Sequence, residues 1–319
     1  MKLVILIPAF NEEKNLGKVL KKIPRKIKGI DQIDVLVVND GSTDQTAAIA
    51  RQNGAKVISH QKNRGLGAAF KTGIDEALKM GADIIVNIDA DGQFNPQDIP
   101  LLIAPILSGQ AQMATATRFK EKSLIPANIP PAKLWGNRQF TRLINFLTKQ
   151  NFTDTQCGFR AYSREAALRL NLFGQFTYTQ EVFIDLLEKG MTITEVPLKV
   201  TYFKNSQRKS AISGSLLKYG FRALEIVLRT FRDYRPLLFF GIPGMAICLP
   251  GFILAFGSLI YWLILKKTSP VRMYLFTGIV LILFGFLLIF LALVADMFKR
   301  MRKNQEEILY QMKKKELEK

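Results

Sequence analysis

The sequence has few of the residues from which catalytic triads, disulfide frameworks and zinc sites are built. Its 319 residues include one histidine, His60, and two cysteines, Cys157 and Cys248. A lone histidine argues against a triad or a histidine-rich metal site, and we expect His60 to be an ordinary strand-end residue. The cysteines lie far apart in the sequence and Cys248 lies in an apolar stretch, so neither a disulfide framework nor a metal-ligand cluster is indicated.

Acidic residues are scarce relative to basic ones. The chain carries 45 lysines and arginines against 26 aspartates and glutamates, which gives a formal net charge of +19. Such an excess predicts an anionic partner, which could be a nucleic acid, a lipid surface or a phosphorylated substrate. Hydrophobic residues make up 48% of the chain, which is enough for one large domain with a sizeable core plus an appendage.

Charge is missing altogether from two stretches near the carboxyl end. Residues 236–265 and 273–295 contain no charged side chain, and each stretch exceeds the roughly 20 residues that a helix needs to cross a bilayer. We predict two transmembrane helices in a hairpin, and the alternative is a pair of buried helices in a soluble core. Basic residues that flank the hairpin put both chain ends on the cytoplasmic side, although Lys266, Lys267 and Arg272 in the connecting loop weaken that bias. Attraction to anionic lipid explains these basic residues, so we expect no nucleic-acid partner.

The first 120 residues alternate short apolar runs with helical stretches. The apolar runs are LVILIPAF, DVLVVND, AKVISH, ADIIVNID and QMATATRF. This alternation predicts a parallel sheet with helices on both faces, and ligands bind such sheets at the carboxyl ends of the strands. The amino-terminal run reads as the first buried strand and not as a signal peptide, because it is short and meets a proline and two acids.

The chain divides into four parts. We expect a catalytic domain over residues 1–213, an amphipathic juxtamembrane helix over 214–235, two transmembrane helices within 236–298 and a basic cytoplasmic tail over 299–319. A basic amphipathic helix beside a membrane span is typical of the lipid interface, and packing against the catalytic domain is the alternative. Within the catalytic domain, the proline-bearing segment SLIPANIPPAKLWGNRQ is interpreted either as a mobile flap or as a plain connection.

Two acidic residues lie where the fourth apolar run ends. In DADGQ, Asp89 and Asp91 are two residues apart, so their side chains point to the same side of an extended segment. Two such carboxylates suit a divalent cation, because Mg²⁺ usually binds through one or two carboxylates plus substrate phosphates. Polar residues also follow the first, second and fifth runs, and we expect all four strand ends to meet at one site: Asn11 and Glu12, Asp40 to Ser42, and Arg118.

Five motifs follow one another along the chain: IPAFNEE, VVNDGSTDQT, NRGLGAAFKTGI, DADGQ and TDTQCGFRAYSREA. They resemble those of family 2 glycosyltransferases of the GT-A fold, and with the helix pair the chain resembles polyprenyl-phosphate glycosyltransferases such as the dolichyl-phosphate mannose synthases and their bacterial glucosyl counterparts. The resemblance implies an α/β fold with a Rossmann-like mixed, mostly parallel sheet.

The implied reaction is inverting transfer of a single hexose from a nucleotide diphosphate sugar, of the UDP-glucose or GDP-mannose type, to a polyprenyl or dolichyl phosphate at the cytoplasmic membrane face. The Gln-x-x-Arg-Trp pattern of processive synthases is missing from the sequence, which favours one transfer per turnover. The alternative is a membrane-tethered nucleotide-sugar binding protein without transferase activity. The sequence leaves the oligomeric state open, and a homo-oligomer is one possibility.

The resemblance also implies roles for individual residues. The nucleotide pocket is expected to involve Pro8, Ala9, Glu12, Asp40, Asp89 and Ala90. A Mg²⁺ or Mn²⁺ ion is expected to bind Asp89, Asp91 and Gln93. Catalytic roles are expected for Asp91, Arg118 and Asp154, of which Asp154 either acts as a base or only orients a cation. The acceptor phosphate is expected to contact Arg138, Arg208, Lys209 and Ser210. Arg208 and Lys209 are expected there by position as well, since they lie between the last expected strand and the juxtamembrane helix, and a solvated basic loop attracted to anionic lipid is the alternative.

Overall fold

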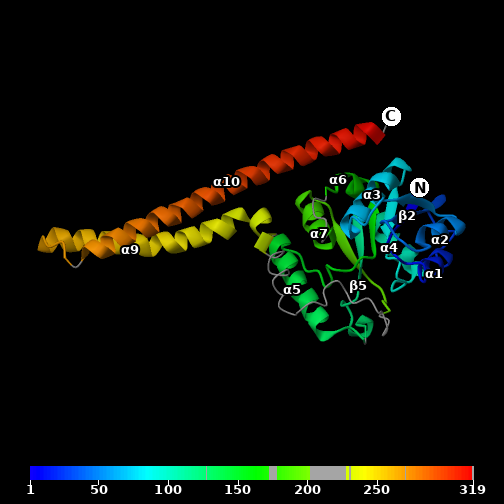
Figure 1. The fold of residues 1–319 in the computed structure, drawn as a ribbon, viewed down its shortest axis with the longest axis horizontal. Coiled ribbons are helices and arrows are strands. Elements are labelled where there is room, and N and C mark those ends of the chain that lie inside the picture. Colours follow the sequence, from blue (N-terminus) through cyan, green and yellow to red (C-terminus); the bar gives the residue numbers. More distant parts are fainter. Residues whose placement is uncertain (127, 172–177, 202–227, 230, 270, 318–319) are drawn as a thin grey trace. The chain divides into compact units, whose positions relative to one another are not determined.

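The structure is a computed structural model that describes the chain except for residues 127, 172–177, 202–227, 230, 270 and 318–319 (Figure 1). It divides into two compact units, Met1–Arg208 with Ile308–Lys319, and Lys209–Glu307. Most of the juxtamembrane helix expected over 214–235 lies outside the described residues, and so do the expected phosphate contacts Arg208, Lys209 and Ser210. These therefore stay predictions.

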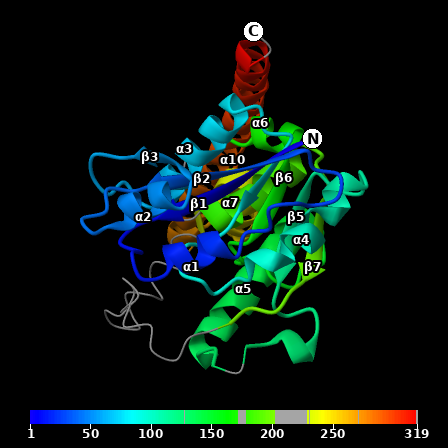
Figure 2. The ribbon, with the colours of Figure 1, turned by 90° about the vertical axis from the view of Figure 1, so that its right-hand side faces the viewer.

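A seven-stranded sheet forms the centre of the first unit, in the order β3-β2-β1-β4-β6-β5-β7 (Figure 2). Within this sheet β6 runs antiparallel to both of its neighbours, and the other pairings are parallel. The five predicted strands are present, and the sheet is mixed and mostly parallel, as the GT-A resemblance implied. The strands are β1 (Lys2–Ala9), β2 (Gln32–Asn39), β3 (Lys56–Ser59), β4 (Ile84–Asn87), β5 (Met113–Thr117), β6 (Arg160–Ser163) and β7 (Ile193–Pro197).

Helices cover both faces of the sheet, because the central strand β1 is apolar on both sides. Leu3, Ile5 and Ile7 belong to a core cluster that includes residues of α1 and α4. Leu6 points to the opposite face, where α3 comes so close that a Cβ at Gly73 would overlap the Leu6 side chain. The helices of this unit are α1 (Leu16–Lys21), α2 (Thr46–Gln52), α3 (Leu66–Lys79), α4 (Ile99–Leu107), α5 (Pro131–Thr148), α6 (Arg164–Arg169) and α7 (Tyr178–Glu188), with 3₁₀ turns η1 (Pro96–Asp98) and η2 (Lys122–Leu124).

Three parts of this unit depart from the simplest reading of the sequence. The proline-bearing segment interpreted as a flap or connection is helical from Pro131 onward, since proline is favoured in the first turn of a helix. The strand β6 is not predicted, because it has only four residues and begins with Arg160. The sequence run ITEVPLKVTYF is strand-like, but β7 ends within it at Pro197, since proline has no N–H for the sheet ladder.

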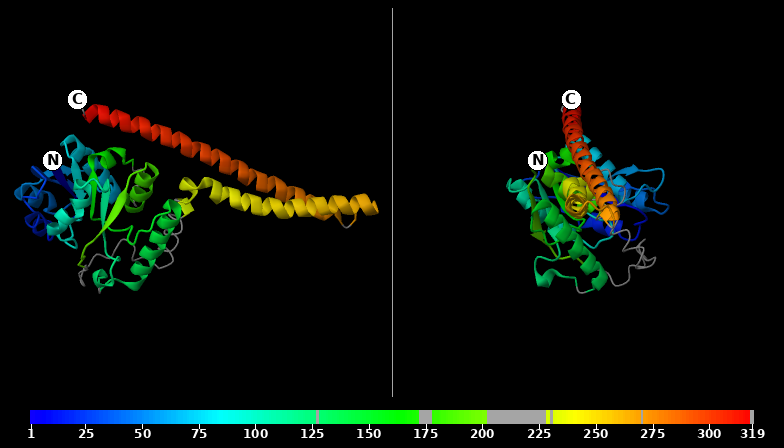
Figure 3. Two further views of the ribbon diagram at one scale, coloured as in Figure 1. Left: turned by 180° about the vertical axis from the view of Figure 1, so that it is seen from behind. Right: turned by 90° about the vertical axis from the view of Figure 1, so that its left-hand side faces the viewer.

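The second unit contains long apolar helices. A π-helical turn (Leu237–Gly241) leads into α9 (Ile242–Leu265), and α10 (Val271–Leu317) follows after a short connection. The two apolar spans have mean hydropathies of 2.2 and 3.1, and by length and composition both helices could cross a membrane. The charged tail after residue 298 continues α10 as a helix (Figure 3).

Helices α9 and α10 meet through glycines. A Cβ at Gly244 would lie 2.9 Å from the carbonyl oxygen of Gly285, and a Cβ at Gly251 would lie 2.9 Å from that of Gly278. Cys248 lies between Gly244 and Gly251 in the sequence of α9 and is 6% exposed. Any side chain at these glycines would collide with backbone of the facing helix, so the two backbones approach closely along this face.

The last turns of α10 belong to the first unit and contact α6. Tyr310 is 5% exposed and donates from Oη to Glu165 Oε2 at 2.9 Å. The guanidinium of Arg169 lies 4.0 Å from the centre of the Tyr310 ring. Burial and the neighbouring Glu165 carboxylate both raise the pKa of Tyr310. Residues 308–317 therefore pack as part of this unit.

Candidate active site

Two strand ends frame the candidate site. Both β4 and β5 pair with β6, and Arg160 of β6 lies opposite Asn87 of β4 and Thr115 of β5. The carboxyl ends of β4 and β5 therefore lie at the same end of the sheet, about two strand spacings or roughly 10 Å apart. Asp89 follows β4 and Arg118 follows β5. The segment that leads into β6 crosses the space between them.

The expected metal ligands lie just beyond β4. Asp91 accepts hydrogen bonds from Gln93 N at 3.0 Å and from Gln93 Nε2 at 2.9 Å, so these two side chains orient each other. The carboxylate of Asp89 lies against Gly158, where a Cβ would be 2.9 Å from Oδ2. Among the described residues no group of three or more histidine, cysteine, aspartate or glutamate side chains could hold a metal ion. Two carboxylates and an amide fit Mg²⁺ or Mn²⁺, which complete their coordination with phosphate and water oxygens.

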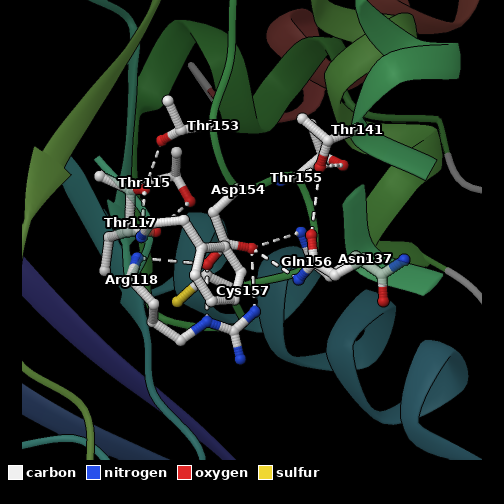
Figure 4. A network of polar contacts seen from close by, with 12 residues as sticks. Thr115, Thr117, Arg118, Asn137, Thr141, Thr153, Asp154, Thr155, Gln156 and Cys157 are labelled. Atoms are coloured by element: carbon white, nitrogen blue, oxygen red, sulfur yellow. Dashed lines mark hydrogen bonds and ion pairs between the residues drawn. The ribbon is translucent and has the colours of Figure 1, made fainter. Parts of the chain in front are cut away.

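A buried ion pair lies at the end of β5 (Figure 4). Arg118 donates through Nε to Asp154 Oδ2 at 2.6 Å and through Nη2 to Oδ1 at 2.9 Å, which is a bidentate arrangement. Asp154 Oδ1 also accepts from Asn137 Nδ2 at 3.1 Å and from the backbone amide of Gln156 at 3.2 Å. Arg118 is 6% exposed and Asp154 is fully buried. The Asp154 carboxylate is therefore surrounded by donors.

These donors determine the protonation state of Asp154. Burial on its own would raise the pKa of this carboxyl, but the hydrogen bonds and charge of Arg118 outweigh it, with help from Asn137 and Gln156, and the pKa lies below its usual range. An ionised carboxylate with occupied acceptor sites is a poor base and a good anchor for a guanidinium. In contrast, burial raises the pKa of the nearby Cys157 thiol to about 12, so this thiol is unreactive at neutral pH.

Asp40, at the end of β2, is engaged within the chain. Its Oδ1 accepts from the amide of Arg64 at 2.9 Å and lies 2.7 Å from His60 Nδ1, while Oδ2 accepts from the amide of Gly65 at 2.8 Å. The other ring nitrogen of His60 is 3.0 Å from Thr72 Oγ1. His60 thus follows a strand, as expected, and it also orients the Asp40 carboxylate and the loop beside it.

The other residues expected in the nucleotide pocket lie near the ends of β1 and β4. Pro8, Ala9 and Ala90 are buried. Glu12 is 6% exposed, and its amide donates to Thr46 Oγ1 at 2.8 Å. Since β1 lies between β2 and β4 in the sheet, these residues and Asp40 follow three neighbouring strands.

One expected phosphate contact falls on a described helix. Arg138 lies on α5, one residue after Asn137, and its side chain is exposed. Asn137 is buried and donates to Asp154 (Figure 4), whereas Arg138 lies on the exposed side of α5. Its role in phosphate binding stays a prediction.

Three residues around the site are not predicted from the sequence: Asn137, Arg160 and Glu195. Glu195 on β7 accepts hydrogen bonds from the amides of Thr153 and Asp154, both at 2.8 Å. Asn137 falls in the segment read as a flap or connection, and Glu195 falls in a strand-like run. Arg160 and Glu195 each carry a signal, because each is a charged residue in an otherwise apolar stretch.

A family model and several relatives match this chain. The model described as Glycosyl transferase family 2 matches residues 4–170. An uncharacterized protein of Methanocaldococcus jannaschii is 35% identical over 69% of this chain and 88% of that protein. The UDP-N-acetylglucosamine–dolichyl-phosphate N-acetylglucosaminyltransferase of Methanococcus voltae is 30% identical over 68% of this chain and 91% of that enzyme. Polyprenol monophosphomannose synthase of Mycolicibacterium smegmatis is 28% identical over 67% and 82%.

Solved structures share the fold. A crystal structure of glucosyl-3-phosphoglycerate synthase from Mycobacterium tuberculosis superposes with a TM-score of 0.52 at 24% sequence identity, covering 72% of this chain and 79% of that chain. That enzyme has also been crystallised with Mn²⁺ and UDP-glucose. The similarity extends the GT-A assignment from motifs to architecture. The chain belongs to glycosyl transferase family 2 and is a glycosyltransferase.

Proposed function

We propose that the protein transfers a single hexose, with inversion, from a nucleotide diphosphate sugar to a polyprenyl or dolichyl phosphate. The observation that carries this proposal is the buried Arg118–Asp154 pair, which shares one end of the sheet with Asp89 and Asp91. A fixed cation suits an acceptor phosphate, and paired carboxylates suit a diphosphate with its metal ion. The names of the Methanococcus and Mycolicibacterium relatives, a dolichyl-phosphate transferase and a polyprenol monophosphomannose synthase, support this acceptor class.

The donor is bound at the ends of β1, β2 and β4 in this proposal. Asp89, Asp91 and Gln93 hold Mg²⁺ or Mn²⁺, which when bound neutralises charge on the departing diphosphate. The nucleotide contacts the backbone and side chains that follow these strands, with Asp40 and Glu12 as the polar groups. The M. tuberculosis enzyme that shares the fold was crystallised with this class of ligand.

The acceptor needs little activation. A phosphate monoester has a second pKa of about 6 and is largely dianionic at neutral pH. One phosphate oxygen attacks the anomeric carbon while the bond from that carbon to the diphosphate breaks. The configuration at the anomeric carbon is thereby inverted, and a nucleoside diphosphate leaves. No proton has to be removed from the acceptor. Catalysis then rests on positioning and on electrostatic stabilisation.

Asp154 orients Arg118 in this mechanism. Of the two roles considered from the sequence, orientation of a cation is favoured by the bidentate contact and the lowered pKa of Asp154. Arg118 binds an acceptor phosphate oxygen and holds it toward the donor. A guanidinium is suited to this because it stays charged and presents donors in a rigid fork.

The membrane part of the proposal concerns residues 208–298 and the side of the membrane on which the two chain ends lie. The helices α9 and α10 form the transmembrane hairpin, with the catalytic domain and both termini on the cytoplasmic side. A juxtamembrane helix over 214–235 lies in the lipid interface, where a long-chain acceptor is also found. Arg208, Lys209 and Ser210, together with Arg138, contact the acceptor phosphate.

A donor screen tests the proposed function. Full-length protein in detergent is incubated with a polyprenyl phosphate, Mn²⁺ or Mg²⁺, and in turn UDP-glucose, GDP-mannose, UDP-galactose and the N-acetylated sugars. We expect one donor to give a polyprenyl-phosphate-linked sugar by mass spectrometry, with one equivalent of nucleoside diphosphate released. Nucleotide-sugar binding without product across the panel would favour the alternative, a membrane-tethered binding protein.

A further inference from the structure

The segment of residues 153–158 touches both sides of the candidate site. At one end, Asp154 binds Arg118 through two hydrogen bonds. At the other end, Gly158 lies against the carboxylate of Asp89. The position of this one segment therefore determines the spacing between the expected acceptor cation and the expected metal carboxylate.

A row of side chains crosses the sheet at the level of this segment. In the strand register Asn87 of β4 is opposite Arg160 of β6, Arg160 is opposite Thr115 of β5, and Thr115 is opposite Glu195 of β7. Directly opposed residues of neighbouring strands project to the same face. Four polar residues thus form one row across four adjacent strands of the sheet. We call Asn87, Arg160 and Glu195 the polar row, since these three bind the segment.

Glu195 binds the start of the segment. Its Oε1 accepts from the amides of Thr153 and Asp154, both at 2.8 Å. Its Oε2 accepts from the amide and the hydroxyl of Thr153, both at 3.0 Å. Hydrogen bonds from backbone amides to a carboxylate are about twice as strong as neutral ones. The carboxylate therefore fixes the backbone directly at Asp154.

Arg160 and Asn87 bind the rest of the segment. Arg160 is fully buried and donates through Nε to Cys157 O at 2.8 Å and through Nη2 to Thr155 O at 3.0 Å. Asn87 Nδ2 donates to Gly158 O at 2.8 Å. Burying a guanidinium is costly unless its donors are used, and here two of them are used on the segment.

We propose that the polar row positions the two halves of the site for sugar transfer, with Glu195 fixing the Arg118 side and Asn87 fixing the Asp89 side. This inference rests on the proposed function. The chemistry along the row is matched to the backbone: a carboxylate takes the amides of 153 and 154, and N–H donors take the carbonyls of 155, 157 and 158. The three residues act through the segment, so they are positioning residues and not catalytic ones.

Glu195→Gln is the primary test, because Glu195 is only partly buried at the edge strand and the variant is expected to fold. A glutamine offers one oxygen and places an amino group against the backbone amides. In full-length protein, well below the melting temperature, we expect kcat to fall about tenfold to a hundredfold, because a displacement near 1 Å can cost about a hundredfold. The KM for nucleotide sugar should stay unchanged, since the donor side is held by the other end of the row.

Glu76→Gln is the matched control. It makes the same chemical change at a carboxylate that pairs with Lys56 Nζ at 2.7 Å on the surface, and kcat should match that of the wild type. Asn87→Ala acts on the opposite end of the segment, so the KM for nucleotide sugar and the concentration of Mn²⁺ required for UDP binding should both rise.

Hydrogen exchange gives a readout that needs no turnover. Amides of residues 153–158 should exchange faster in Glu195→Gln than in the wild type or in Glu76→Gln. Faster exchange with a wild-type kcat would make the row merely structural and overturn the inference, and unchanged exchange would show that Glu195 does not hold the segment. A wild type that transfers no sugar from any donor overturns the proposed function, and the positioning role with it, whatever the exchange result.

Discussion

The two units of the chain are packed by opposite rules. In the first unit the central strand contributes large apolar side chains, and Leu3 to Ile7 are all fully buried. In the second unit the helices meet at glycines, and the large apolar side chains point outward, with Ile264 72% and Phe276 70% exposed. One chain thus contains a core of large apolar side chains and a helix contact formed by glycines.

The difference indicates the solvent to which each unit is adapted. In water, burying apolar area contributes about 25 cal/mol per Å², so large side chains turn inward. Lipid tails are as apolar as leucine, and helices in lipid associate through close packing that small residues permit. The outward apolar surface and the glycine contact therefore both support the proposed transmembrane hairpin.

The largest effect we expect is the loss of turnover when an expected metal ligand of the first unit is removed. Asp91→Ala should lower turnover by about a thousandfold, because metal stabilisation of the leaving group contributes several kcal/mol. The melting temperature should stay close to that of the wild type. Steady-state assays across a Mn²⁺ titration measure this, with Asp98→Ala as an acidic control outside the strand ends. Full activity in excess EDTA would contradict it.

The next effect concerns the buried ion pair. At pH 7, Asp154→Asn should lower the free energy of unfolding by about 3 kcal/mol, because Arg118 is left buried without its counter-charge. The pKa of Asp154 is lowered in the folded state, so its stabilisation is complete above the unfolded-state pKa of about 3.9 and is lost as the pH falls further.

Denaturant unfolding across pH measures this effect. The difference in unfolding free energy between the wild type and Asp154→Asn should shrink below pH of about 4. A difference that grows on acidification would mean that the carboxyl is protonated in the folded protein.

Shortening a large apolar side chain should lower the stability of the first unit only. Leu6→Ala should cost about 2 to 5 kcal/mol, because it leaves a cavity between β1 and Gly73 of α3. Leu249→Ala in α9 removes the same atoms from a side chain that is 65% exposed, and it should change stability little. Thermal unfolding of both variants gives the comparison, and equal losses would break the contrast between the units.

Adding a large side chain at the glycine contact should lower the stability of the second unit. Gly285→Leu should cost about 1 to 3 kcal/mol, because the added side chain forces the two helix backbones apart. Gly257→Leu is the control, since a Cβ at Gly257 has no neighbour within 4 Å. Unfolding in mixed micelles with rising SDS, followed by circular dichroism, measures both. A neutral Gly285→Leu would mean that the glycine contact does not hold the hairpin.

Features that depend on local sequence are the ones that could be predicted. The strands β1 to β5 are short apolar runs bounded by polar residues, and the two spans are long uncharged runs, so periodicity and length suffice. The carboxylates of Asp89 and Asp91 were predicted to share a strand end, and the structure has them just beyond β4. That they bind metal stays a prediction.

Features that depend on distant pairing could not be predicted. The antiparallel insertion of β6 brings Arg160 between Asn87 and Thr115, residues more than 40 positions away. Glu195 is charged in a strand-like run, and only the register of β7 explains it. The glycines of α9 and α10 are visible in the sequence, but which of them face each other depends on the rotation of each helix.

The two cysteines give each unit its own internal probe of opening. Cys157 is 1% exposed in the first unit and Cys248 is 6% exposed at the glycine contact of the second. Neither thiol can be alkylated at an appreciable rate until its surroundings open, when the pKa of Cys157 returns from about 12 toward the ordinary 8.5. A membrane-permeant alkylating reagent followed by peptide mapping therefore reports two local opening equilibria from one sample of unmodified protein. The natural sequence thereby allows the opening of residues 153–158 and the opening of the helix contact to be measured separately, without any engineered label.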